Sequence, residues 1–268
     1  MSSCYTSTRW MKYGGMAAGA AAMTAYCILG NEPVPVVRIM YGILMLALIS
    51  LLGLGAAQYY SIYRMNQALA LLNRDLKPEE FLAAFTPVAA RCKKGTIQEI
   101  MAWVYVSSGQ LAAGRSSQAM DTLKALKPEE LKNRRYAAHG LVFNQMFQCL
   151  HQEKDAEGEE QILMKIRDLS VQMEGRQPAL AAHLKNNARL FEEYVNLDAG
   201  REVDCLYLEE EIRLSANALH RNQVHMVLAD AYGRAGNAEQ EQSHLRAAAE
   251  EGSQTDLARQ ARARLAAG

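Results

Sequence analysis

The longest hydrophobic stretch of the chain runs from Val36 to Tyr60, and residues 39–57 contain no charged side chain. A helix rises about 1.5 Å per residue, so about 20 apolar residues cross a hydrocarbon core of about 30 Å. Arg38 lies near one end, and tyrosines followed by Arg64 lie at the other, as expected at headgroup depth. The pattern predicts a membrane-spanning helix over 36–60. The alternative is a buried core helix, but globular helices of this length normally carry a polar face.

A second uncharged stretch, Gly14–Gly30, is rich in alanine and glycine and has three interpretations. The three are a signal peptide with Arg9 and Lys12 as its basic region, an alanine-rich leader, and a short first membrane span. Residues 31–35 contain two prolines, which disfavour helix and favour a tight connector. We favour a hairpin of two transmembrane helices, 14–30 and 36–60.

Small residues recur in both predicted spans. Gly15 and Gly19 are four residues apart, a spacing that lets two helix backbones approach closely in lipid. Gly53 and Gly55 offer small surfaces on the second helix. These four glycines are the predicted residues of membrane helix packing.

Basic residues near the span ends predict the orientation. One side of the hairpin carries only Arg38, beside Glu32. The basic residues of the other side are Arg9, Lys12, Arg64, Arg74 and Lys77. This bias places both termini and the C-terminal domain in the cytoplasm. With a single span the charges nearly balance, so an envelope protein with an exported domain stays open.

The remainder of the chain is predicted to be helical. From residue 61 onward apolar residues recur at spacings of three and four, without the alternation of strands. The predicted organisation is a short tail over 1–13, the hairpin over 14–60 with its connector at 31–35, and a helical domain over 61–268. The fold class is therefore all-α.

The C-terminal part carries a recognisable pattern. It consists of His225, Leu228, Ala229, Tyr232, Gly236, Leu245 and Ala248. These positions resemble a tetratricopeptide repeat (TPR), in which a small residue and an aromatic on one helix pack against a second helix after a tight turn. Glu241 departs from the family, which usually has a small alanine there. A looser match contains Gly114, Ala119, Leu123 and Leu126.

Turn signals about 40 residues apart separate further helix pairs. The turns are at 154–155, 199–200 and 236–237. The predicted pairs are Tyr136–His151 with Ala156–Leu169, and Pro178–Leu197 with Glu202–Leu214. The pattern predicts TPR-like helix pairs stacked as an α-solenoid from about Ile97 to the end, closed by a capping helix over Leu257–Leu265.

The resemblance implies binding of a partner protein or peptide in a concave groove, and hence a scaffold or adaptor at the cytoplasmic membrane surface. The first helix of each pair would line this groove. The predicted partner-binding residues are Trp103, Tyr136, Phe143, Asn187 and Tyr232.

No sequence pattern indicates chemistry. The chain has 29 basic and 29 acidic residues, which argues against nucleic-acid binding. It contains no HExxH, P-loop, GxGxxG or GxSxG motif, and His220 and His225 do not share a helix face. We therefore predict no catalytic residue, cofactor or metal, although a membrane enzyme with an unrecognised site stays open. Five scattered cysteines without a CxxC pair indicate a reducing compartment rather than a disulfide framework.

Overall fold

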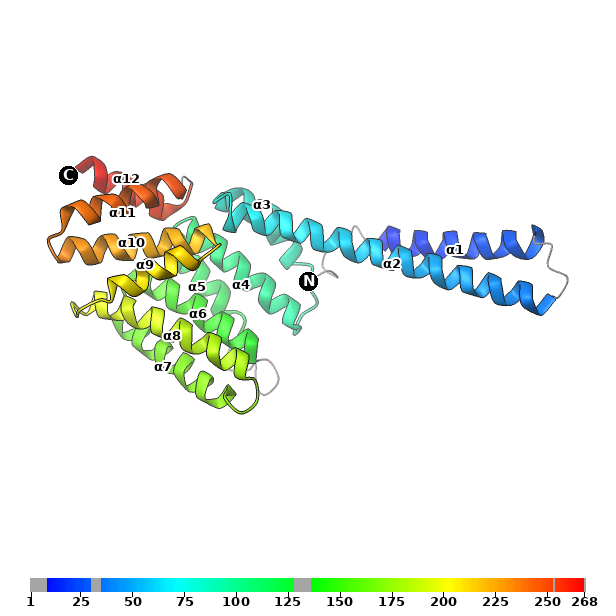
Figure 1. Ribbon diagram of the computed structural model, residues 1–268, viewed down its shortest axis with the longest axis horizontal. Helices are drawn as coiled ribbons and strands as arrows, with labels where there is room; N and C mark the ends of the chain where they lie inside the picture. Colours follow the sequence, from blue (N-terminus) through cyan, green and yellow to red (C-terminus); the bar gives the residue numbers. More distant parts are fainter. Residues whose placement is uncertain (1–8, 30–34, 128–135, 253, 268) are drawn as a thin grey trace. The chain divides into compact units, whose positions relative to one another are not determined.

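The computed structural model describes residues 9–29, 35–127, 136–252 and 254–267 (Figure 1). The described residues form twelve helices and no strand, which confirms the all-α class. The chain divides into two compact units, residues 1–67 and 68–268. Each unit is considered separately below.

The first unit contains α1 (Arg9–Leu29) and most of α2 (Pro35–Asn73), which continues past the unit boundary. Glycines allow the two helices to touch. A Cβ atom at Gly15 would lie 2.9 Å from the Cα atom of Gly53, and one at Gly19 would lie 3.1 Å from the carbonyl oxygen of Leu46. No atom comes within 4 Å of the corresponding position at Gly55.

The contacts also define the direction of the two helices. Tyr26 of α1 meets Tyr41 of α2 edge to face, with ring centroids 6.3 Å apart. Residue numbers along α1 therefore rise where those along α2 fall, so the pair is antiparallel.

One helix of the described residues is long and apolar enough to cross a membrane, and it is the part of α2 over Ile39–Asn73. Only 6% of its most apolar window is buried in the protein. Its most exposed apolar side chains include Met40, Leu44, Leu51 and Leu52. A core helix of a soluble domain would instead be mostly buried. Helix α1, the first of the two predicted spans, does not meet the same criterion.

After the end of α2, the described residues of the second unit form ten helices. They are α3 (Pro78–Ala89), α4 (Ile97–Ala112), α5 (Ser116–Lys124), α6 (Tyr136–Glu153), α7 (Ala156–Met173), α8 (Pro178–Asp198), α9 (Cys205–Leu214), α10 (Ala218–Arg234), α11 (Ala238–Glu251) and α12 (Asp256–Ala267).

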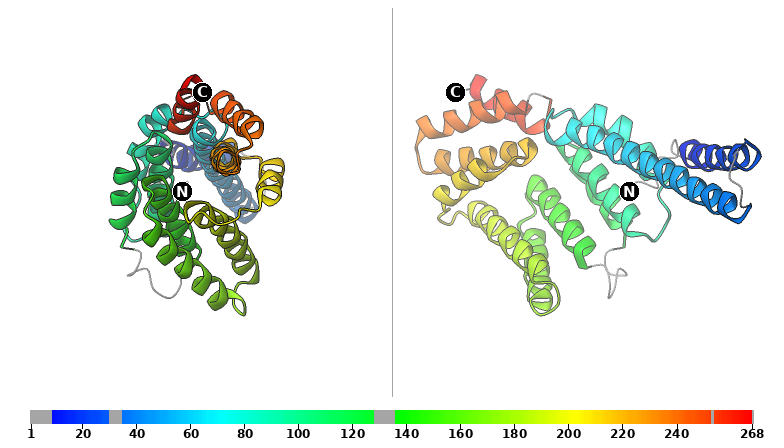
Figure 2. Two further views of the ribbon diagram at one scale, coloured as in Figure 1. Left: turned by 90° about the vertical axis from the view of Figure 1, so that its left-hand side faces the viewer. Right: turned by 45° about the vertical axis from the view of Figure 1, so that its right-hand side comes forward.

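The even-numbered helices of this unit form an inner layer. Helix α4 packs on α6, α6 on α8, α8 on α10 and α10 on α12. We call α4, α6, α8, α10 and α12 the inner helices. The outer helices α5, α7, α9 and α11 each pack on an adjacent inner helix, and Figure 2 shows consecutive helices side by side in chain order.

The same turn follows four of the inner helices. A residue in the left-handed region comes after each of them: Gly114 (φ 82°) after α4, Lys154 (φ 59°) after α6, Gly200 (φ 70°) after α8 and Gly236 (φ 74°) after α10. In every case the amide of the next residue donates to the carbonyl five positions earlier, at 2.8–3.0 Å. This is the Schellman motif, which ends a helix and reverses the chain within a few residues.

The last helix returns to the first inner helix. The Arg259 guanidinium on α12 donates to the carbonyl oxygen of Ala113, just beyond α4, at 3.2 Å. The Gln152 amide of α6 donates to the Asp256 carboxylate at 3.4 Å. An open stack of helix pairs would hold its first and last members apart. The inner layer instead closes on itself through α12.

Two of the described cysteines, the buried Cys149 and the half-buried Cys205, are free thiols. The expectation of a reducing compartment stays a prediction.

A buried asparagine joins the last three helices. The Asn222 side chain is fully buried, its amide donates to the carbonyl of Ala248 at 2.8 Å, and its oxygen accepts from the Thr255 hydroxyl at 3.1 Å. Thr255 in turn accepts from the Ala258 amide at 3.2 Å and so caps α12. A side chain at Gly252 would collide with Asn222, so the glycine leaves room for this network.

We expect Asn222→Ala to lower the free energy of unfolding by about 1–3 kcal/mol, because two buried hydrogen bonds are lost. The measurement is urea unfolding of the full chain in detergent, followed by circular dichroism. Asn186→Ala, at an exposed position of α8, is the matched control and should change stability little. Equal stability of the two variants would contradict this role of Asn222.

Candidate functional site: a cavity between the inner helices

A cavity of about 140 Å³ lies between the inner helices. Every inner helix contributes to its wall. The lining residues are Leu111, Ala112, Gln148, His151, Gln152, Lys154, Tyr194, Leu219, Gln223, Met226, Val227, Asp230, Thr255, Leu257, Gln260 and Arg264. Ligand pockets for drug-sized molecules are larger, about 300–1,000 Å³, so this cavity suits a small group or a short piece of a chain.

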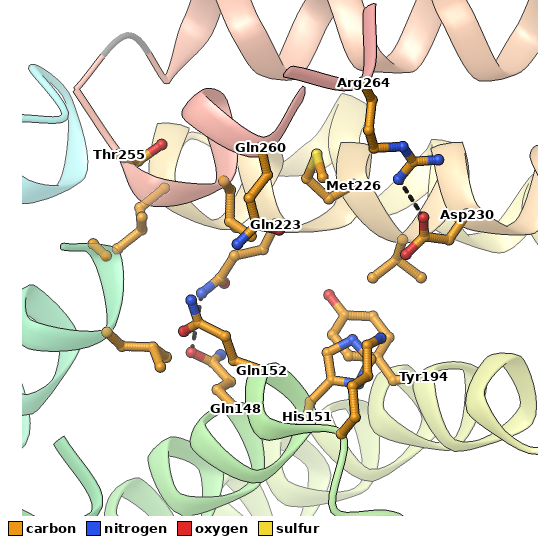
Figure 3. Close-up of a pocket in the computed structure, with 16 residues that line it drawn as sticks. Gln148, His151, Gln152, Tyr194, Gln223, Met226, Asp230, Thr255, Gln260 and Arg264 are labelled. Carbon is orange, nitrogen blue, oxygen red and sulfur yellow. Dashed lines mark hydrogen bonds and ion pairs between the residues drawn. The ribbon is translucent and has the colours of Figure 1, made fainter. Parts of the chain in front are cut away.

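Amide side chains dominate one wall. Gln148 and Gln152 come from α6, Gln223 from α10 and Gln260 from α12, and Figure 3 shows them facing one another. Gln223 donates to the Gln148 oxygen at 3.2 Å. Gln152 and Gln260 both donate to one carboxylate oxygen of Asp256. Each glutamine amide has two donor hydrogens and an acceptor oxygen, so capacity remains for a ligand that both donates and accepts.

Charged side chains occupy the opposite wall. Arg264 of α12 pairs with Asp230 of α10 (Figure 3), and its second nitrogen donates to Glu241 at 2.7 Å. Glu241 rests against Gly233, where a Cβ atom would lie only 2.9 Å from its carboxylate. The departure from the TPR pattern at Glu241 therefore has a physical reason: the glycine makes room for an acidic partner of Arg264.

His151 lies between two carboxylates beneath the cavity. Its Nδ1 atom is 2.8 Å from Asp198 Oδ2 and 3.2 Å from Glu159 Oε1. Lys154 pairs with the other oxygen of Asp198 at 3.1 Å. Burial opposes a charge on His151, but hydrogen bonds and attraction to the two carboxylates prevail and raise its pKa. For Asp198, burial is likewise outweighed by His151 and Lys154, which lower its pKa to about 2.

Aromatic rings enclose His151. The Phe147 ring stacks on Phe191 with centroids 4.1 Å apart, and the Tyr194 centroid is 4.8 Å from that of His151. Burial raises the pKa of Tyr194, so its hydroxyl stays neutral. Thr255 carries the remaining hydroxyl among the lining residues, and it is engaged in the cap of α12. The polar groups that face the cavity are hydrogen-bonding and ionic groups suited to binding. They lie beside apolar side chains, among them Leu111, Leu219 and Leu257.

None of the five predicted partner-binding residues lines this cavity. Tyr136, Phe143 and Tyr232 are half-buried and pack against the hydrophobic core of the second unit. Trp103 is half-buried on α4, and Asn187 on α8 contacts His183 at 3.4 Å. The structure does not bring the five together, because the aromatic residues contribute to packing between helices.

The cavity residues nevertheless have a sequence signal. Gln148, His151 and Gln152 follow one another at spacings of three and four, which places them on one face of α6. Glu159 and Asp198 have no such signal, because they reach His151 from two other helices. Polar residues at these spacings on the first helix of each pair therefore identify part of the cavity wall from the sequence.

Comparison with protein-family models, curated proteins and solved structures found no match.

A second histidine cluster joins α10 and α11. The Nδ1 atoms of His225 and His244 are 3.0 Å apart, and the His244 ring stacks on Tyr232 with centroids 5.5 Å apart. Tyr232 donates to Glu209 at 2.6 Å. Burial and then the neighbouring His244 lower the pKa of His225 to about 4, and burial lowers that of His244.

The His225–His244 pair predicts acid sensitivity. Unfolded histidine titrates near pH 6.5, whereas folded His225 titrates near 4, so its contribution to stability is present above pH 6.5 and is lost as the pH falls toward 4. Arg221 reinforces this shift, and Glu251 opposes it.

We expect the wild-type protein to lose about 1–2 kcal/mol of unfolding free energy between pH 6.5 and 4.5 relative to His225→Gln, allowing for partial solvent screening. Urea titrations of both proteins at several pH values measure the difference. His183→Gln, at an exposed position, should follow the wild type. A constant difference between wild type and His225→Gln would show that His225 does not contribute.

Proposed function

We propose that this protein is a membrane-anchored, TPR-like helical-repeat scaffold or adaptor that binds a peptide segment of a partner protein at the cytoplasmic membrane surface. The single observation that carries the proposal is the amide-rich cavity formed jointly by all five inner helices.

The exposed apolar surface of α2 supports a membrane anchor. Water-exposed surfaces of soluble proteins rarely carry large contiguous apolar patches. Met40, Leu51 and Leu52 are each 65% exposed, and Leu44 is 61% exposed. The close glycine contacts of α1 with α2 support insertion as a hairpin, because small residues permit such packing in lipid.

The recurring left-handed turn supports a repeat architecture. Four successive inner helices end in the same Schellman motif, and each is followed by an outer helix that reverses the chain. Inner helices that pack on one another, with outer helices behind them, are the arrangement of TPR-like solenoids. The contact of α12 with the turn between α4 and α5 makes this stack of helices more closed than an extended superhelix.

The chemistry of the cavity supports a peptide ligand. Each residue of an extended peptide offers one N–H donor and one carbonyl acceptor, and glutamine amides complement both. The nearby cations are already engaged, Arg264 by Asp230 and Glu241, and Lys154 by Asp198. The ligand is therefore a neutral, polar segment and not an acidic one.

Photocrosslinking tests the proposed binding cavity. A benzophenone amino acid at Gln223, inside the cavity, should crosslink to a partner in native membranes. The same residue at Gln240, on the exposed surface of α11, should not. Gln152→Ala combined with the probe at Gln223 should reduce the crosslink several-fold, because a cavity amide is lost. Equal crosslinking at both positions, or none at Gln223, would contradict the proposal.

The side of the membrane has two candidate answers. The basic residues near the span ends favour a cytoplasmic domain, and the alternative is an exported domain behind a single span. A labelling experiment decides between them. Burial raises the pKa of Cys149 to about 12 and also raises that of Cys205, so both native thiols react poorly.

We therefore expect an introduced thiol, Ser243→Cys on the exposed face of α11, to report the side of the membrane. With a cytoplasmic domain, a membrane-impermeant maleimide labels this cysteine only after the cells are permeabilised. The wild-type protein, treated identically, gives the background. Labelling in intact cells would overturn the cytoplasmic placement and establish the exported alternative.

A further inference from the structure

Three potential metal ligands from three helices converge beneath the cavity. His151 lies near the end of α6, Glu159 in the first turn of α7 and Asp198 at the end of α8. Their ligand atoms, one imidazole nitrogen and two carboxylate oxygens, all lie within 4.8 Å of one another.

The hydrogen bonds within this cluster leave some of its buried carboxylate oxygens without a partner. His151 presents Nδ1 to both carboxylates, and a ring nitrogen carries at most one hydrogen, so only one carboxylate can accept at a time. Glu159 is fully buried, and its Oε2 atom has no hydrogen-bond partner. Asp198 Oδ2 is close to His151 but is also without an aligned donor. Buried polar atoms without partners are costly and uncommon.

The dimensions fit a small divalent ion. Zinc binds imidazole nitrogen and carboxylate oxygen at about 2.0–2.2 Å, so tetrahedral ligand atoms are separated by about 3.3 Å. The two distances from His151 Nδ1, 2.8 and 3.2 Å, require adjustments of about half an ångström or less. Two carboxylates supply the charge that neutralises a divalent cation, and one histidine with carboxylates is a donor set that suits zinc.

The neighbouring residues give an ion access to the site and hold one of its ligands in position. His151 lines the inner cavity, and Asp198 lines an adjacent polar groove with Lys154 and Arg234, so an ion has a path from solvent. Lys154 contacts the Asp198 oxygen that faces away from His151, so it can orient this ligand while the ion is bound.

We propose that His151, Glu159 and Asp198 form a binding site for a divalent transition-metal ion, with Zn²⁺ as the best fit and a fourth position open to solvent. The competing arrangement is an ion-pair cluster in which a protonated His151 takes the place of the metal. The two differ in whether the protein takes up a stoichiometric ion.

The test uses the full chain in detergent, stripped with a chelator, dialysed and supplied with Zn²⁺ alone. Elemental analysis after desalting should find one zinc ion per chain, and thermal unfolding should shift to higher temperature. Glu159→Gln and His151→Gln should each weaken zinc affinity at least tenfold, because each removes a ligand.

Two control variants should retain wild-type affinity. Glu160→Gln changes the exposed neighbour of Glu159 on α7. His225→Gln breaks the His225–His244 pair, whose Nδ1 atoms are 3.0 Å apart and which lies outside the proposed site. Circular dichroism checks that every variant is folded, and the visible absorption of Co²⁺ added to the wild-type protein gives a second readout.

Failure of the wild-type protein to bind stoichiometric zinc would overturn the site and leave the ion-pair cluster. Zinc binding that is lost in His225→Gln but kept in Glu159→Gln would also overturn it. Neither outcome depends on whether the cavity binds a peptide.

Discussion

The left-handed turn that follows α4, α6, α8 and α10 is the constraint on which the second unit depends. It reverses the chain within a few residues, so an outer helix can pack behind and the next inner helix can return beside the previous one. Glycine adopts this conformation without steric cost at 114, 200 and 236. After α6 the residue is Lys154, and such a conformation is unusual for a side chain larger than that of asparagine. Its ammonium group pairs with Asp198, so the strained turn places a cation beside the buried carboxylates.

The two units carry surfaces of different chemistry. The exposed face of α2 is apolar and uncharged over residues 39–57, whereas the cavity of the second unit adds amides, carboxylates and cations to its apolar side chains. Apolar exposure is favourable only beside lipid or another apolar surface, and a buried polar wall is favourable only when its groups are paired. In the cavity most pairs are made by residues distant in sequence, such as Gln148 with Gln223. The wall therefore exists only when the inner helices are assembled.

Local signals were sufficient to predict the helices and their turns. Helices α7 and α8 begin at the predicted residues Ala156 and Pro178. Helix α9 was predicted too early, from Glu202, because the cap that starts it is Asp204, whose side chain accepts from the amide of Tyr207.

The site was not predictable in the same way. His151, Glu159 and Asp198 meet only because three helices cross at that depth, and no local pattern encodes their convergence. An aromatic side chain on a first helix gains more free energy from burial between helices than from facing a cavity walled by amides. Tyr136 and Phe143 accordingly pack against the core, and the glutamines take the inner face.

The contact between Arg259 and Ala113 has a consequence for biosynthesis. It joins residues 146 positions apart, whereas an ordinary solenoid is built from contacts between neighbours and can form repeat by repeat as the chain emerges. Here the wall contributed by α12 is absent until this helix itself has been synthesised. The growing chain therefore exposes the amides of α6 and α10 until then, and the cavity is completed only in a step that follows synthesis of α12.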